Sequence, residues 1–389
     1  MAGFLNEEHE SLRDSVRKFV EKEIVPIADE LDNRAAEIPM EVIRKMAEQG
    51  YFGLILPDSY GGAGMDHLSM AIVTEELSRG WLSVGSVMTR NVIAGTLILN
   101  GGTEEQKKRW LPGLADGSLL SAAAFTEPNH GSDTASFELK AEKKGDHYVL
   151  NGPKTWCTFA NRANVMTILA RTNPDKSLRH KGLSMLVLEK KPGDDFMPPK
   201  LTGSYIPAIG YHGLKSWSLN FEDLELPVTN LIGGEEGKGF YQLMTTYESA
   251  RIQTAARGLG VAQAAYDHAL QYARERKQFG KYLAEHQLIR HKLAHMATDI
   301  EALRQLLYYA CAMKDQGKRC DLEAGMAKVK AGEVAEHVTS EAMQIHGGYG
   351  YSKEYRAQRF WRDGRIIKIF EGTSEIQAEV IAKRIIDGK

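Results

Sequence analysis

The chain has 389 residues, of which 43% are hydrophobic and 26% are charged. At about 150 residues per domain, this length indicates two or three domains, and the hydrophobic content excludes a largely disordered chain. The formal net charge of −2 at pH 7 gives no sign of a surface that binds nucleic acid.

The chain shows no run of about 18 apolar residues and no basic segment followed by an apolar one near its start. We therefore expect neither a membrane span nor a signal peptide. Three widely spaced cysteines argue against a disulfide framework and against a zinc site. They suit a reducing compartment, namely the cytoplasm, or the mitochondrial matrix in a eukaryote, and we expect no bound metal.

Residues 1–120 show helical periodicity and form the first expected domain. Asn6 is suited to cap the first helix, because its side chain can accept a hydrogen bond from the backbone of the first turn. That helix is expected to break at Pro26 or shortly beyond it. Further helices are expected near 66–79, 87–100 and 104–110.

Residues 121–232 show the alternation that is typical of strands and form the second expected domain. Lys144-Gly145-Asp146 marks a turn between two strands, and Asn151-Gly152 is typical of another hairpin turn. Six or so strands without intervening helices indicate an antiparallel barrel or sandwich. Residues 233–389 are helical again, and long helices joined by short connections indicate a bundle. The expected fold class is therefore α+β.

Five segments place glycine beside hydroxyl, aromatic or charged side chains where one element gives way to the next. Taken singly, each is explained as well by local structure, such as a tight turn, a core tryptophan or a helix cap. The segments are TEPNHGSD (126–133), NGPKTW (151–156), RKQFG (276–280), QIHGGYG (344–350) and FEGTSEIQ (370–377).

Glu371 is the strongest candidate for acid–base chemistry. It follows Ile369 and Phe370, and apolar neighbours would desolvate its carboxylate, raise its pKa and make it a usable base near neutral pH. The alternative is an ordinary acidic residue just before a helix capped by Thr373, where the helix dipole favours negative charge.

Arg90 is the second unusual residue, because it interrupts the otherwise apolar helical segment around Val87, Met88 and Val92. A cation in such a place either extends to water or meets an anion. If the anion is a carboxylate, the guanidinium can bind it through two charge-assisted hydrogen bonds.

In their order and spacing, the five segments make the chain resemble the acyl-CoA dehydrogenases over nearly its whole length. The resemblance implies an N-terminal helical domain, a central β domain and a C-terminal four-helix bundle. It also implies a homotetramer, a dimer of dimers, with FAD at subunit interfaces. The implied reaction is α,β-dehydrogenation of an acyl-CoA thioester, with electrons passed on to an electron-transfer flavoprotein.

The resemblance also assigns roles to residues. Glu371 matches the catalytic base of most members, and its backbone N–H, with a ribityl hydroxyl of FAD, would hold the thioester oxygen. Other members carry the base just before an arginine of the long helix, but here Ala250 precedes Arg251 and cannot take a proton. The implied FAD contacts are Phe125, Thr126, Gly131, Ser132, Trp156, Thr158, Arg276, Gln278, Phe279, Gln287, Gln344, Gly347, Gly348, Thr373 and Glu375. The implied substrate contacts are Arg90, Ser132, Glu248, Arg251 and Gly372, although Glu248 and Arg251 also fit an ion pair along one helix face.

The stretches TYESARIQTAARGLGVAQ (246–263) and KRCDLEAGMAK (318–328) resemble the methylsuccinyl-CoA dehydrogenases. The implied substrate is a short, branched dicarboxylic monothioester of CoA. Alternatives are a benzylsuccinyl-CoA substrate, for which His130 could reshape the pocket, and a short or branched monocarboxylic thioester. Other classes are an acyl-CoA oxidase, usually a longer chain, a flavin-containing nucleic-acid-binding relative, which the charge disfavours, and a scaffold homologue, which Glu371 disfavours.

Overall fold

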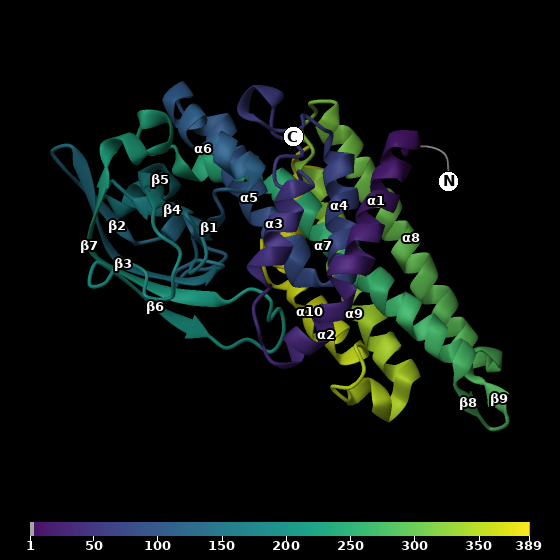
Figure 1. Cartoon of the computed structure of the whole chain (residues 1–389). Helices are drawn as coiled ribbons and strands as arrows, with labels where there is room; N and C mark the ends of the chain where they lie inside the picture. The colour runs from purple at the N-terminus through teal and green to yellow at the C-terminus, as the bar shows by residue number, and fades with distance from the viewer. Residues whose placement is uncertain (1–3, 389) are drawn as a thin grey trace.

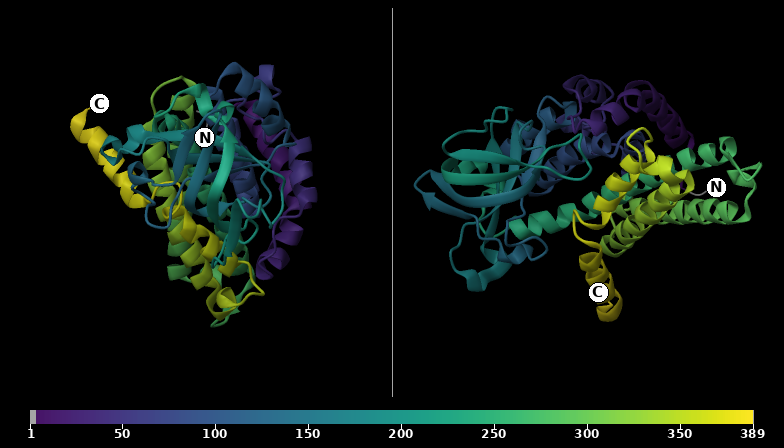
Figure 2. Two further views of the ribbon diagram at one scale, coloured as in Figure 1. Left: turned by 90° about the vertical axis from the view of Figure 1, so that its left-hand side faces the viewer. Right: turned by 90° about the horizontal axis from the view of Figure 1, so that it is seen from below.

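The computed structural model describes residues 4–388. Figure 1 shows the main sheet on one side of the molecule and the long helices on the other, with the N-terminal helices against both. The two further views in Figure 2 show the long helices extending away from the sheet, and the C-terminal helix standing apart from the rest. The helical, β and helical parts of the expected fold are thus all present, and the expected fold class is confirmed.

From residue 4 onward, the N-terminal part contains six α-helices. Asn6 caps the first one, because its side chain accepts from the backbone N–H of His9 at 2.9 Å. Pro26 lies in the first turn of the second helix, where its missing N–H costs nothing. The helices are α1 (Glu7–Glu23), α2 (Val25–Asn33), α3 (Met40–Glu48), α4 (His67–Gly80), α5 (Leu82–Gly101) and α6 (Glu104–Asp116).

Helix α5 is the core helix of this part and begins five residues before the position expected from the sequence. It is long and apolar enough to pass a test for a membrane span, with a mean hydropathy of 1.4, but 89% of that window is buried inside the protein. At Gly85 an added Cβ would lie 2.0 Å from Ser78 Oγ of α4, so the two helices pack closely there. The apolar character of α5 therefore reflects its burial in the core.

The middle part is one seven-stranded sheet, with the order β1-β4-β2-β3-β7-β6 and with β5 paired to β4. Most neighbours are antiparallel, but β4 pairs in parallel with both β1 and β2, so the sheet is mixed where the sequence indicated antiparallel strands alone. The strands are β1 (Ser121–Ala124), β2 (Lys140–Lys144), β3 (His147–Thr158), β4 (Val165–Arg171), β5 (Leu183–Glu189), β6 (Leu201–Ile206) and β7 (Ser216–Pro227).

The expected hairpin turn at Asn151-Gly152 is wrong, because β3 runs through both residues. The register of β3 against β7 shifts between Leu150 and Gly152, and Gly152 has φ +132°. Asn151 exchanges two hydrogen bonds of 2.9 Å with Asp223 of β7. The glycine therefore forms a bulge rather than a turn, since the partner strand continues past it.

Up to residue 388, the C-terminal part contains five α-helices, of which α7, α8 and α9 pack along one another and α11 packs on α9. A short hairpin of β8 (Lys277–Gln278) and β9 (Lys281–Tyr282) joins the first two. The helices are α7 (Gly239–Glu275), α8 (Gln287–Asp315), α9 (Asp321–His346), α10 (Ala357–Arg365) and α11 (Ser374–Asp387).

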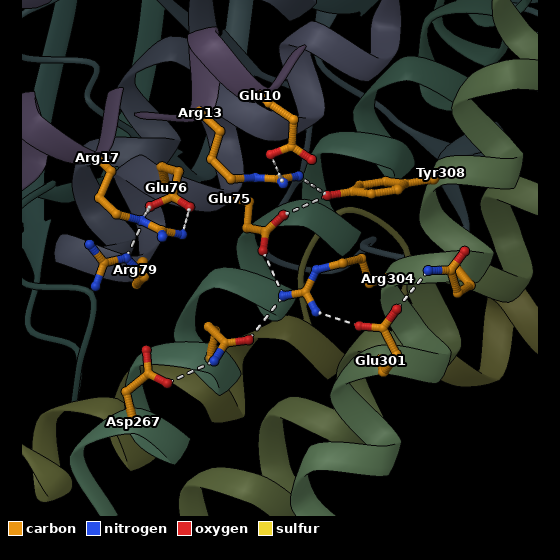
Figure 3. Close-up of polar contacts among 12 residues, drawn as sticks. Glu10, Arg13, Arg17, Glu75, Glu76, Arg79, Asp267, Glu301, Arg304 and Tyr308 are labelled. Atoms are coloured by element: carbon orange, nitrogen blue, oxygen red, sulfur yellow. Dashed lines mark hydrogen bonds and ion pairs between the residues drawn. The ribbon is translucent and has the colours of Figure 1, made fainter. Parts of the chain in front are cut away.

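A polar network joins α1, α4 and α8 (Figure 3). Its centre is Glu75 of α4, which is 3% exposed and accepts from Arg304 of α8 at 2.9 Å. Tyr308 of α8 receives a hydrogen bond of 2.6 Å from Arg13 of α1. The network therefore ties the N-terminal helices to the C-terminal ones.

Candidate active site

Glu371 lies in a tight turn between α10 and α11. Its backbone is in the left-handed region, with φ +54°, and Gly372 follows with φ +86°. Left-handed backbone is costly for a residue with a Cβ, and such strain is concentrated at functional sites. Lys328 of α9 donates a hydrogen bond to the carbonyl of Gly372, and the Thr373 side chain caps α11 through the N–H of Ile376. The turn thus has support on both sides.

Two arginines hold the carboxylate of Glu371. Arg90 Nη2 of α5 lies 2.6 Å from Oε1, and Arg257 Nη2 of α7 lies 2.6 Å from Oε2. The hydroxyl of Thr254, three residues before Arg257, donates to Oε2 at 2.5 Å. The site is therefore assembled from two helices and a turn that are far apart in the chain.

The pKa of Glu371 differs from the expectation. Burial raises that pKa, as the apolar neighbours suggested. The charges of Arg257 and Arg90, together with the hydrogen bonds to the carboxylate, lower it by more than burial raises it, so the pKa is about 2. The sequence-based prediction of a raised pKa is therefore wrong for the protein without substrate. The pKa is lowered because the attraction of the two guanidinium groups for the carboxylate outweighs the effect of desolvation.

Further cations surround the same carboxylate. Arg257 and Lys328 are both fully buried, and Arg251 is 8% exposed. Burial lowers the pKa of Lys328 to about 8, against the charge of Glu371. Arg251 lies over the ring of Tyr247 at 5.7 Å, and its buried Nε has no hydrogen-bond partner among residues 4–388. The surroundings of Glu371 are therefore strongly positive.

The predicted ion pair between Glu248 and Arg251 is not among the contacts of residues 4–388. Glu248 instead accepts from Lys314 of α8 at 2.6 Å and from the thiol of Cys320 at 3.6 Å. Both side chains lie on α7, but Glu248 reaches toward α8 while Arg251 stays near the Glu371 pocket.

The first two glycine-containing motifs lie against each other, the first in the loop that follows β1 and the second in β3. The backbone N–H of Thr155 donates to the carbonyl of Thr126 at 2.8 Å. Buried Lys154 donates to the carbonyl of Phe125 at 2.6 Å and to Glu127 Oε1 at 2.8 Å. This arrangement fixes the loop that carries Gly131 and Ser132 beside the strand that carries Trp156 and Thr158.

The third and fourth motifs meet at the far end of the helices. The guanidinium of Arg276 lies 5.7 Å from the ring centre of Tyr349. The β8–β9 hairpin that carries Gln278 lies at the opposite end of the molecule from the sheet (Figures 1 and 2). Gln287, Gln344, Gly347 and Gly348 are exposed near this end, whereas Thr373 and Glu375 belong to the start of α11.

The sequence did not single out three residues beside Glu371, namely Thr254, Arg257 and Lys328. Arg257 stands in the Ala- and Gly-rich run TAARGLG, and Lys328 stands in GMAKVKAG. Each is a cation in a mostly apolar stretch, which is the signal that identified Arg90. Applied to the whole chain, that signal would have found both.

Family models match three consecutive parts of the chain. The acyl-CoA dehydrogenase N-terminal domain matches residues 6–118, the middle domain matches 122–224, and the C-terminal domain matches 237–386. The chain belongs to the acyl-CoA dehydrogenase family. It is accordingly an oxidoreductase that acts on CH–CH bonds, and the expected resemblance is confirmed.

Individual relatives agree with this assignment. The chain is 50% identical to a (2S)-methylsuccinyl-CoA dehydrogenase of Cereibacter sphaeroides over 99% of this chain and 71% of that protein. It is 39% identical to the caffeyl-CoA reductase–Etf complex subunit CarC of Acetobacterium woodii, over 98% of this chain and 99% of that protein. The structure of a glutaryl-CoA dehydrogenase in complex with glutaryl-CoA matches with a TM-score of 0.93 at 36% identity, covering 100% of this chain and 98% of that chain.

Acyl-CoA dehydrogenases use FAD, and the residues present fit this cofactor. Trp156 is 56% exposed and Phe279 is 95% exposed, so both leave an aromatic face free for a planar ligand. At Gly131, Gly347 and Gly348 an added Cβ would meet nothing within 4 Å, which leaves their backbone open to a ligand.

Proposed function

We propose that this acyl-CoA dehydrogenase oxidises a short, branched dicarboxylic monothioester of CoA of the 2-methylsuccinyl type. The observation that carries the proposal is the convergence of Arg90 and Arg257 on Glu371. With Lys328 and Arg251 close by, several buried cations share one carboxylate. A second anion in the pocket would restore the charge balance, because buried cations are costly unless they are paired.

The free carboxylate of a 2-substituted succinyl-CoA has the chemistry of that missing anion. It is attached to the carbon that loses the β-hydrogen, so it must lie close to the reacting atoms. Arg90 is the cation that we assign to it, since a guanidinium binds a carboxylate in a bidentate manner. The 50% identity to a (2S)-methylsuccinyl-CoA dehydrogenase supports the same substrate class.

Glu371 is the proposed catalytic base, which removes the α-proton of the thioester. When bound, FAD supplies the acceptor for the β-hydrogen. Trp156, Thr158, Phe125 and Thr126 are proposed to hold the flavin ring, and the exposed face of Trp156 suits that role. Gly131 and Ser132 are proposed to contact the flavin on the same side, with Ser132 also near the substrate.

The remaining assignments concern the assembly. The Arg276 segment lies far from the sheet of its own chain, which supports FAD sites shared between subunits of a homotetramer. Gln278, Phe279, Gln287, Gln344, Gly347, Gly348, Thr373 and Glu375 are proposed to contribute to the adenosine-diphosphate end of these sites. An electron-transfer flavoprotein is the proposed electron acceptor, supported by the relationship to a subunit of a reductase–Etf complex.

The substrate class is tested by comparing 2-methylsuccinyl-CoA with 2-methylbutanoyl-CoA, in which a methyl group replaces the carboxylate. We expect kcat/KM of the wild type to favour the dicarboxylate by about 30-fold or more, measured with an artificial electron acceptor. Benzylsuccinyl-CoA is included as a third thioester, and preference for it would indicate a roomier pocket.

Arg90→Met is expected to cost about 2–5 kcal/mol of transition-state stabilisation for the dicarboxylate, because its charge is left unpaired. Arg109→Met is the control. It removes a half-exposed arginine of α6 that forms an ion pair with Glu189 of β5. Equal losses with the charged and uncharged thioesters would mean that Arg90 is structural, and the dicarboxylate proposal would lose its main support.

A further inference from the structure

The two oxygens of the Glu371 carboxylate have different partners. Within residues 4–388, Oε1 is hydrogen-bonded to Arg90 alone, at 2.6 Å. Oε2 is bonded to Arg257 at 2.6 Å and to Thr254 at 2.5 Å. Arg90 approaches from α5, whereas Thr254 and Arg257 approach from α7. The carboxylate is therefore held from two sides by independent helices.

Arg257 is fixed in place. Its side chain is 0% exposed, Nη1 donates to Ser86 Oγ at 3.1 Å, and Nη2 also donates to Thr254 Oγ1 at 2.8 Å. Its guanidinium lies 4.6 Å from the ring centre of Phe370. Moving it away would leave buried polar groups without partners, which is costly.

Arg90 is held far less firmly. Its side chain is 11% exposed, and it makes none of the additional hydrogen bonds, to Ser86 and Thr254, that Arg257 makes. Within residues 4–388, the one hydrogen bond of its side chain is the contact with Glu371. Of the two guanidiniums on the carboxylate, Arg90 is thus the one that is free to change partner.

We propose that Arg257 is a positioning residue that keeps Oε2 of Glu371 in place, while Arg90 exchanges Oε1 for the free carboxylate of the substrate. The inference rests on the proposed dicarboxylic substrate. After the exchange each guanidinium still has one carboxylate partner, and Oε1 is released toward the α-carbon. A monocarboxylic thioester offers no anion in return, so Oε1 stays paired with Arg90 and proton removal is slow.

Several charged and titratable groups around Glu371 enter its pH dependence. They are Arg90 on α5, Tyr247, Arg251 and Arg257 on α7, Lys328 on α9, and Glu375 at the start of α11. Arginine stays charged over the whole working range, so Arg257 supplies a permanent positive charge beside Oε2. Removing that charge raises the pKa of Glu371, and the carboxylate then becomes protonated at a higher pH.

The positioning role is tested with Arg257→Met and Arg257→Lys, using any thioester that the wild type oxidises. For Arg257→Met we expect kcat to fall on the order of 100-fold with little change in KM, and the acidic limb of the kcat/KM profile to move to higher pH. Arg257→Lys restores the positive charge, so the acidic limb of its kcat/KM profile is expected to lie close to that of the wild type. If the acidic limb of Arg257→Met does not move, while its Tm falls and FAD is lost, Arg257 has only a structural role and the proposed positioning role is wrong.

The exchange at Arg90 is tested with isobutyryl-CoA, which lacks the carboxylate of 2-methylsuccinyl-CoA and otherwise keeps its branch. Formate has the size of the missing group. We expect formate to raise turnover of isobutyryl-CoA by the wild type several-fold over chloride at equal ionic strength. Arg90→Met is expected to oxidise isobutyryl-CoA faster than the wild type does, with no response to formate.

The outcomes separate the two proposals. If the wild type prefers 2-methylsuccinyl-CoA but neither formate nor Arg90→Met accelerates isobutyryl-CoA oxidation, the exchange is wrong and the proposed substrate stands. If the dicarboxylate is not preferred, the proposed substrate is wrong and the exchange falls with it. The pH profile of Arg257→Met decides the positioning role in either case.

Discussion

At the scale of single residues, the base and its surroundings carry the chemistry. Glu371→Gln keeps the shape of the side chain and an oxygen that accepts the hydrogen bond from Thr254, but removes the basic lone pair. We expect turnover to fall by at least about 1,000-fold while FAD stays bound. Turnover and flavin absorbance of the purified variant check this, and near wild-type turnover would show that the base is another group.

A second prediction at this scale concerns pH and stability. His346 stacks between Tyr272 and His268, with ring centres 4.2 Å and 4.6 Å apart. Burial, together with the nearby charge on His346, lowers the pKa of His268 to about 4. The unfolded chain, with a histidine pKa of about 6.5, therefore binds more protons between these pH values. Stability is expected to fall as the pH drops from about 6.5 toward 4.

His268→Phe should remove part of this acid-dependent loss, because a phenyl ring stacks without taking up a proton. The measurement is Tm against pH for the wild type and the variant. His337→Gln, a change at an exposed histidine of α9, is the control and should follow the wild type. An unchanged slope in His268→Phe would show that other groups cause the loss.

At the scale of elements, the polar network of Figure 3 holds α1 and α4 against α8. Arg304→Met leaves Glu75, which is 3% exposed, without its main counter-charge. We expect a loss of about 3 kcal/mol in the free energy of unfolding, because a broken buried pair leaves an uncompensated charge. Denaturant unfolding measures it.

Two further variants make that prediction specific. Adding Glu75→Gln to Arg304→Met should restore part of the stability, since the stranded charge is then gone. Arg44→Met breaks an ion pair with Glu41 in which both side chains are more than half exposed, and it should cost under about 1 kcal/mol. Equal losses in Arg44→Met and Arg304→Met would contradict the importance of burial.

At the scale of the whole molecule, the predicted FAD residues of the sheet and those of the β8–β9 hairpin lie at opposite ends of the molecule. We expect a solution mass about four times the 43.3 kDa of one chain, and one FAD per chain. Arg276→Glu reverses the charge of a residue that is expected to contact FAD, and is expected to leave the chain folded but largely without FAD. Light scattering and flavin absorbance measure both quantities.

Arg274→Glu is the matched control, because Arg274 is exposed in the last turn of α7 only two residues earlier. It should keep its FAD. Equal loss of FAD in both variants would mean that FAD binding depends on the overall charge near the β8–β9 hairpin, and not on a specific contact of Arg276.

Much of the fold was accessible from the sequence because local signals decide it. Helical periodicity, the Asn6 and Thr373 caps and the Lys144-Gly145-Asp146 turn all act within a few residues, and the structure contains each of them. The family motifs likewise depend on short runs of residues, so they identified the family from their order along the chain.

The tertiary structure decided what depends on distant partners. Asn151-Gly152 has the composition of a turn, but it forms a bulge because β7 continues beside it. Glu371 and Arg90 are 281 positions apart and still form an ion pair, and Arg257 joins them from a third element. Apolar neighbours in the sequence indicated a raised pKa for Glu371, whereas the folded chain lowers it to about 2. Neighbours along the chain contribute to the desolvation of a carboxylate. Only the packing of distant elements decides which charges lie within hydrogen-bonding distance of it, and here those charges outweigh desolvation in setting the pKa.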